Sequence, residues 1–239
     1  MAYAFVNQTS ATATTNVPSI ALPSYTPVAG NTLLFFLFIT SGGGGTSANL
    51  TDGGVGNSYQ QLFTPVHTAS GIYGFYAQNV AGVATTVTAN FVGGTSHAGI
   101  YLAEYSGIYQ LLGSNAVEVS APGTGANALS SSYFSSGGTP VMVWGFAVDA
   151  SGTAPNAGTS PISFTGQAPV WAPLGAGGTS TCALGEDAAY SAGGSYIAAT
   201  FGPINQFDSY YAAGASFAES NTTLFGSAPA GYLSSDDYF

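Results

Sequence analysis

Residues 32–40 read Thr-Leu-Leu-Phe-Phe-Leu-Phe-Ile-Thr, and the apolar side chains from Leu33 to Ile39 follow one another without a polar interruption. A strand that faces water on one side alternates apolar and polar residues, whereas a strand covered on both faces does not. The run is also too short for a membrane-spanning helix, which needs about 20 residues. Residues 32–40 therefore predict a central β-strand with an apolar layer on each face.

The rest of the chain has the pattern of many short strands. Aromatic and β-branched runs are separated by clusters of Gly, Ser, Pro and Asn, and no stretch keeps an apolar period of 3.6. In residues 100–105, Ile100 and Leu102 are predicted to share one face of a strand, while Tyr101 and Tyr105 share the other. We expect strands at residues 3–6, 17–22, 32–40, 59–63, 72–78, 85–91, 99–105, 117–120, 128–134, 141–149, 162–165, 180–184, 188–191, 196–201 and 210–218.

The chain contains no Lys and no Arg, and its ten Asp and Glu residues give a formal net charge of −10. Nucleic-acid binding relies on Lys and Arg to neutralise phosphates, so we expect no nucleic-acid partner. A basic patch for anionic lipid is excluded for the same reason. We therefore expect function to rest on shape, packing and hydrogen bonds.

The composition is nevertheless that of a folded chain. Disorder goes with low hydrophobicity, whereas 46% of these residues are apolar, including 15 Phe and 15 Tyr. A chain of this length can form a single all-β domain, which we place at residues 1–218. Cys182 is the only cysteine, so no disulfide can form within the chain.

Residues 1–6, Met-Ala-Tyr-Ala-Phe-Val, lack the basic and apolar regions of a signal peptide. We expect either that a leader was removed or that the protein reaches the outside through particle assembly and cell lysis. No membrane insertion is expected. The predicted location is a virion surface or the extracellular space.

The segment 219–239 differs from the rest, because it mixes Asn, Thr, Gly, Pro and Ser with spaced apolar residues. We interpret it as an extended C-terminal tail. Tails with spaced apolar residues pair well with sheet edges, so docking on a neighbouring subunit is favoured over folding back on the same chain. The expected docking residues are Leu224, Phe225, Tyr232, Leu233, Tyr238 and Phe239.

Three segments, in this order, resemble a β-sandwich module that recurs in bacterial secreted or surface proteins and in phage structural proteins. Residues 29–38, Ala-Gly-Asn-Thr-Leu-Leu-Phe-Phe-Leu-Phe, are similar to its GNLLVV core strand. Residues 50–59, Leu-Thr-Asp-Gly-Gly-Val-Gly-Asn-Ser-Tyr, are similar to its VTDSxGNTY hairpin, and residues 100–107, Ile-Tyr-Leu-Ala-Glu-Tyr-Ser-Gly, to its LEYSG strand end. The resemblance implies a jelly-roll-like (concanavalin-like) antiparallel β-sandwich without a recognised catalytic centre.

Catalytic groups are few. Glycoside hydrolysis would need two carboxylates facing one cleft, and Glu104, Glu118 and Asp149 are the candidates. A carboxylate of Glu104 inside the fold would have to rely on backbone N–H groups, hydroxyls or a metal, because no basic side chain exists. His67 and His97 do not accompany a Gly-x-Ser-x-Gly nucleophile motif. We expect that the protein is not an enzyme.

A calcium ion is the metal hypothesis. Asp52 in a Gly-rich turn could join Asn57 and carbonyl oxygens around a hard cation. An Asx-turn, in which Asp52 binds its own backbone, is the favoured interpretation of the same residues. No cofactor is otherwise expected.

Exposed aromatic residues could form a platform for a glycan. Trp171, between Pro169 and Pro173, is the better candidate and Tyr109 is a further one, although a packing role is favoured for such residues. Trp144 lies in an apolar run and is predicted to be core.

The sequence thus favours a non-enzymatic structural subunit of an extracellular or virion assembly, such as a phage decoration or tail-type protein. Its partners would be copies of itself or other structural subunits. The alternatives are a secreted surface filament or adhesin subunit and a carbohydrate-binding module.

Overall fold

The structure is a computed structural model and describes residues 3–40, 47–67, 70–92, 96–119, 134–135, 141–149, 165–166, 182–190, 196–197, 199, 201 and 210–219. The regular elements in these residues are β-strands, and every pairing between them is antiparallel. The described residues include no apolar helix of the length that a membrane crossing requires. The prediction of an all-β fold with antiparallel sheets is confirmed.

The strands are β1 (Ala4–Val17), β2 (Ser19–Ala21), β3 (Thr32–Thr40), β4 (Ser47–Thr51), β5 (Gln60–Gln61), β6 (Val66–His67), β7 (Ser70–Ala77), β8 (Thr88–Val92), β9 (Ser96–Ser106), β10 (Ile108–Val119), β11 (Phe134–Ser135), β12 (Val141–Asp149), β13 (Thr165–Gly166), β14 (Cys182–Tyr190), β15 (Tyr196–Ile197) and β16 (Tyr210–Glu219). The middle sheet has the order β1-β9-β3-β7-β5, with β6 also paired to β7. A five-stranded sheet has the order β10-β16-β12-β14-β13, and a three-stranded sheet the order β2-β8-β4. β11 and β15 form a separate two-stranded ladder.

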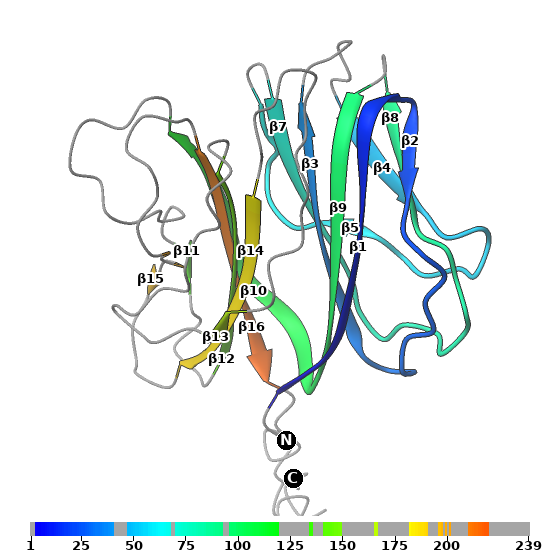
Figure 1. Cartoon of the computed structure of the whole chain (residues 1–239). Coiled ribbons are helices and arrows are strands. Elements are labelled where there is room, and N and C mark those ends of the chain that lie inside the picture. The colour runs from blue at the N-terminus through cyan, green and yellow to red at the C-terminus, as the bar shows by residue number, and fades with distance from the viewer. Residues whose placement is uncertain are drawn as a thin grey trace, which may run out of the picture.

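The middle sheet lies between the other two sheets (Figure 1). One apolar cluster joins it to the five-stranded sheet, and a second joins it to the three-stranded sheet. On β3, Leu34, Phe36 and Phe38 belong to the first cluster. The intervening residues of β3 belong to the second cluster: Leu33, Phe35, Leu37 and Ile39. The predicted central strand with two covered faces is confirmed.

β9 alternates as its sequence predicts. Ile100 and Leu102 pack in the cluster beneath the three-stranded sheet, while Tyr101 and Tyr105 pack against the five-stranded sheet. Glu104 continues the series of Ile100 and Leu102, so its carboxylate faces away from the five-stranded sheet. The polar groups of Glu104 and Tyr105, which are neighbours in β9, therefore lie on opposite faces of the middle sheet.

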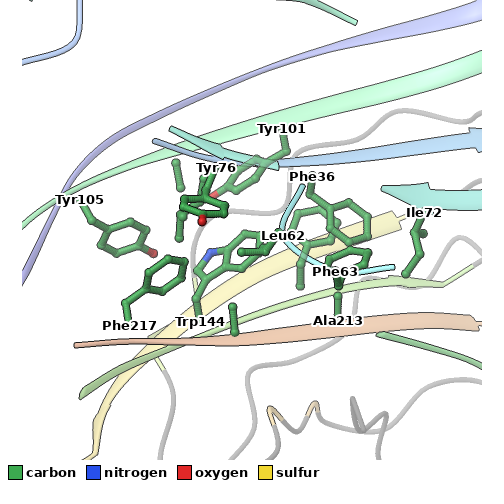
Figure 2. Packing of buried hydrophobic residues seen from close by; sticks show 14 of the residues in the cluster. Phe36, Leu62, Phe63, Ile72, Tyr76, Tyr101, Tyr105, Trp144, Ala213 and Phe217 are labelled. Carbon is green, nitrogen blue, oxygen red and sulfur yellow. The ribbon is translucent and has the colours of Figure 1, made fainter. Parts of the chain in front are cut away.

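Aromatic side chains fill the space between the middle and five-stranded sheets (Figure 2). The rings of Phe36 and Phe146 stack with their centroids 3.8 Å apart, and Trp144 lies 6.1 Å from Phe146. Trp144 is fully buried, as the apolar run around it predicts. Such aromatic pairs stabilise a core through their large buried area and through favourable tilted or offset contacts.

Several strand boundaries differ from the predictions. Residues 182–190 form the single strand β14, although two strands were expected at 180–184 and 188–191. Gly185, Glu186 and Asp187 do not end the strand, because each of them pairs with a residue of β12. Strand β10 begins directly after Gly107, which has a φ of 75°, and so starts well before the expected residue 117.

Candidate functional site

A carboxylate of the five-stranded sheet is bound by two tyrosines of the neighbouring layer. Asp187 lies in β14, and its carboxylate accepts a hydrogen bond from the Tyr105 hydroxyl at 2.9 Å. The Tyr3 hydroxyl, just before β1, donates to the same carboxylate at 3.0 Å. Tyr101 lies beside this group and donates its hydroxyl hydrogen to Gln8 of β1 at 2.8 Å. Tyr105 of β9 and Tyr3, just before β1, thus tie the middle layer to the five-stranded sheet, while the Tyr101 bond joins β9 to β1 within the middle sheet.

These tyrosines are held in their neutral, donating form. Burial raises the pKa of Tyr105 well above its ordinary value, and the nearby charge of Asp187 raises it further. Burial and the same carboxylate raise the pKa of Tyr3 and of Tyr101. At neutral pH each therefore keeps its proton and serves as a hydrogen-bond donor.

Glu104 is held on the opposite side of the middle sheet. Its carboxylate accepts hydrogen bonds from the Val28 N–H at 2.8 Å and the Asn31 side-chain amide at 2.6 Å. The Tyr25 hydroxyl also donates to it. The expectation that a buried Glu104 would depend on backbone N–H groups and hydroxyls is confirmed, with a side-chain amide added.

The other acidic candidates do not join Glu104 in its sheet. Glu118 pairs with Tyr211, and Asp149 pairs with Tyr210, so both lie in the five-stranded sheet beside β16. Glu104 lies in the middle sheet, and its oxygens are engaged by the loop before β3. The described geometry therefore offers no paired carboxylates that include Glu104.

Asp52 organises the loop after β4. Its carboxylate accepts hydrogen bonds from the backbone N–H of Gly54 at 3.3 Å and of Asn57 at 3.0 Å, and from the Tyr59 hydroxyl at 3.3 Å. Positive φ angles at Gly53, Gly54 and Gly56 let the chain turn around this carboxylate. Although burial by itself acts to raise it, these donors hold the pKa of Asp52 below its ordinary value.

The two residues proposed for calcium occupy the same loop but have different hydrogen-bonding partners. The side-chain oxygen of Asn57 accepts a hydrogen bond from the Ala81 N–H at 3.0 Å. Asp52 is surrounded by N–H and O–H donors, which is the arrangement of an Asx-turn extended over a longer loop. In the described part of the chain, no three His, Cys, Asp or Glu side chains form a group suited to a metal. Calcium binding stays a hypothesis.

Of the aromatic and tail candidates, only Tyr109 belongs to the residues that the structure describes. Tyr109 lies in β10 and is 45% exposed, so its ring is accessible. Trp171 lies outside the described residues. The tail candidates also lie outside them: Leu224, Phe225, Tyr232, Leu233, Tyr238 and Phe239.

Strand β1 is an exposed feature that the sequence analysis missed beyond residue 6. It has 14 residues, and in the described residues its strand pairing is with β9 alone, at the edge of the middle sheet. Residues 4–7, 12 and 14–16 are exposed, and the remaining residues of β1 are half-buried. The frequent Thr residues between 9 and 15 are good strand formers, and this was the available signal.

Comparison of the chain with protein-family models, with curated proteins and with solved structures found no match.

Proposed function

We propose that the protein is a non-enzymatic structural subunit of an extracellular or virion assembly, of the phage decoration or tail type. The observation that carries the proposal is that three carboxylates are bound by donors of the protein itself. The carboxylates of Asp52, Glu104 and Asp187 each accept several hydrogen bonds from the protein itself. These three carboxylates hold loops and layers together, which favours a structural role.

The topology supports a jelly-roll-like sandwich as the finer description of this fold. Neighbouring strands in the middle and five-stranded sheets are mostly not consecutive in the chain. Such order is typical of Greek-key and jelly-roll connections. The resemblance of residues 29–38, 50–59 and 100–107 to a module of phage and bacterial surface proteins favours the same assignment.

Assembly and location can be tested together. Sedimentation velocity on the full chain should show oligomers that grow with concentration, and a chain ending at Glu219 should form smaller species while keeping β16. Immunogold labelling should place the protein on particles or filaments outside the producing cell. Phage-like particles would support the virion assignment, whereas labelled cell-attached fibres would favour a filament or adhesin subunit. A chain that is monomeric at every concentration and absent from particles would overturn the proposal.

The exposure of Tyr109 supports carbohydrate binding as a second candidate function. An accessible tyrosine ring can stack on a sugar. Screening the full chain on a glycan array tests this candidate, with Tyr109→Ala and Trp171→Ala as variants. Loss of a glycan signal in either variant would favour a binding module over a purely structural subunit.

A further inference from the structure

We infer that the free edge of β1 is a self-association surface, where β1 of a second copy pairs with it antiparallel about a two-fold axis. This inference rests on the proposed assembly function and names the surface that assembly uses. The edge is long and regular. From Asn7 to Ala13, each residue pairs in unbroken register with β9, from Glu104 to Ala98. An ordered edge strand presents a row of outward N–H and C=O groups that another strand can satisfy. Within this stretch the Gln8 N–H already donates to the Asn7 side-chain oxygen at 2.8 Å, so the pairing relies on the groups that follow it.

The edge lacks the features by which proteins commonly block such pairing. Protective edges carry charged residues, prolines or bulges. The stretch Asn7-Gln-Thr-Ser-Ala-Thr-Ala13 contains no charge and no proline. The register shifts of β1 lie outside it, between Phe5 and Asn7 and between Ala13 and Val17.

Other edge strands of the described fold are less suited. β10 has 12 residues, but it carries Glu118, and its register is interrupted at two places near its beginning. β4 and β2 have 5 and 3 residues, and β5 and β13 have 2 each. β1 therefore offers the longest uncharged edge.

Charge favours β1 over other surfaces for contact with a second copy. Copies with a net charge of −10 and no basic residue repel one another wherever their acids approach. Residues 3–51 contain no acidic residue, so a β1 contact brings together the uncharged part of both sequences. Glu219 is the nearby exception, since its charge acts on Tyr3 at the beginning of β1. Pairing centred further along the strand avoids it.

The sequence of β1 is also compatible with itself. Residues 9–15 are only Thr, Ser and Ala, so antiparallel pairing about the strand centre places small residues opposite small residues. Cross-strand Thr pairs are favourable in sheets. With the axis at Ala11, Ser10 lies opposite Thr12 and Thr9 opposite Ala13 of the second copy, within the regular part of the strand. The result is one continuous sheet across two copies, with the self-complementary contact that a two-fold axis requires.

The test places a charge on this edge of the full chain. Thr12 is exposed in the middle of β1, and Thr12→Asp and Thr12→Lys bring like charges together across the axis. Dimer dissociation is measured by sedimentation equilibrium, with circular dichroism to verify the fold. Each variant should weaken the dimer about tenfold or more, because like-charge contacts oppose association. Mixing the two variants should restore a heterodimer. Thr64→Asp, at an exposed position outside β1, is the matched control and should dimerise like the parent chain.

Each result decides the inference. If Thr12→Asp and Thr12→Lys both dimerise like the parent chain, the β1 contact is absent. If both are monomeric but their mixture does not associate, the contact does not pair β1 with β1. If either variant fails to fold, Ser10→Asp and Ser10→Lys replace the pair, because Ser10 is half-buried and lies as close to the axis as Thr12. Oligomers that survive these changes but are lost on truncation at Glu219 would refute the β1 edge and leave the proposed assembly function intact.

Discussion

The hydroxyl of Tyr105 and the carboxylate of Asp187 are joined by a 2.9 Å hydrogen bond that connects two layers of the sandwich. The two residues are 82 positions apart in the chain, and each is buried. Their contact is the counterpart of an ion pair in a protein that contains no Lys or Arg. An uncharged donor satisfies the carboxylate without bringing a second charge into the core.

Removing this donor should destabilise the fold. Tyr105→Phe keeps the ring but leaves Asp187 with one hydroxyl donor fewer, so the free energy of unfolding should fall by about 1.5–3 kcal/mol. Urea denaturation followed by circular dichroism measures the change. Tyr109→Phe removes the same atom from an exposed ring and is the control, expected to leave stability unchanged. Equal stability of both variants would show that the Tyr105 bond contributes nothing.

The protein should unfold in alkali as its buried tyrosines ionise. An unfolded tyrosine has a pKa of about 10, whereas burial and the charge of Asp187 raise the pKa of Tyr3, Tyr101 and Tyr105 in the folded state. The stability that these groups contribute is therefore complete below about pH 10 and is lost as the pH rises above that value. Tyrosinate absorbance and circular dichroism should change together in one cooperative step. Complete ionisation with an intact fold would contradict the assignment.

Asp52 should make the free energy of unfolding depend on pH in the acidic range. Its folded-state pKa is lowered, so its contribution is present above the unfolded value of about 3.9 and is lost as the pH falls through the folded value. Asp52→Asn should reduce the free energy of unfolding by about 1 kcal/mol at neutral pH. The difference between variant and parent should shrink as the solution is acidified. Denaturation curves at several pH values measure it, and a constant difference would count against the depressed pKa.

The calcium hypothesis has a direct measurement. The Asp52 oxygens are engaged by N–H and O–H donors, and the Asn57 oxygen by Ala81. We therefore expect the same unfolding temperature with a chelator and with excess calcium. A ligand that binds the folded state raises this temperature. A calcium-dependent rise that disappears in Asp52→Asn would establish a site in the loop.

Gly74 should tolerate no side chain. A Cβ atom there would lie 2.3 Å from the Phe63 ring, which is far below van der Waals contact. Gly74→Ala should therefore cost about 1–3 kcal/mol of stability through overpacking. Phe63→Leu removes the ring, and a double-mutant cycle by urea denaturation should show that Gly74→Ala costs less in that background. Strictly additive effects would mean that the two residues do not interact.

The sequence was most informative where burial is strongest. The unbroken apolar run of β3 indicates two covered faces, and the alternation of β9 assigns Tyr101 and Tyr105 to one of them, because side-chain direction follows directly from strand geometry. The boundaries of β12 at Val141 and Asp149 were also correct. Local patterns of this kind do not depend on distant residues.

Exposed strands and contacts between distant residues were harder to predict from the sequence. Most of β1 was missed because an edge strand of Thr, Ser and Asn lacks a continuous apolar face. The contact of Tyr3 with Asp187 spans 184 positions, and no local pattern indicates it. No local pattern indicates that Asp187 is buried either, because its burial follows from the pairing of β14 with β12.

The bonds from Tyr3 and Tyr105 to Asp187 also determine how the fold responds to ionic strength. Dissolved ions weaken attraction between opposite charges, but these donors are neutral and their acceptor is shielded from solvent. The remaining long-range electrostatic force is repulsion among acids, which added salt reduces. Added salt should thus leave the hydrogen bonds between the layers intact and weaken the repulsion among the acidic groups. The protein should therefore be least stable at low ionic strength.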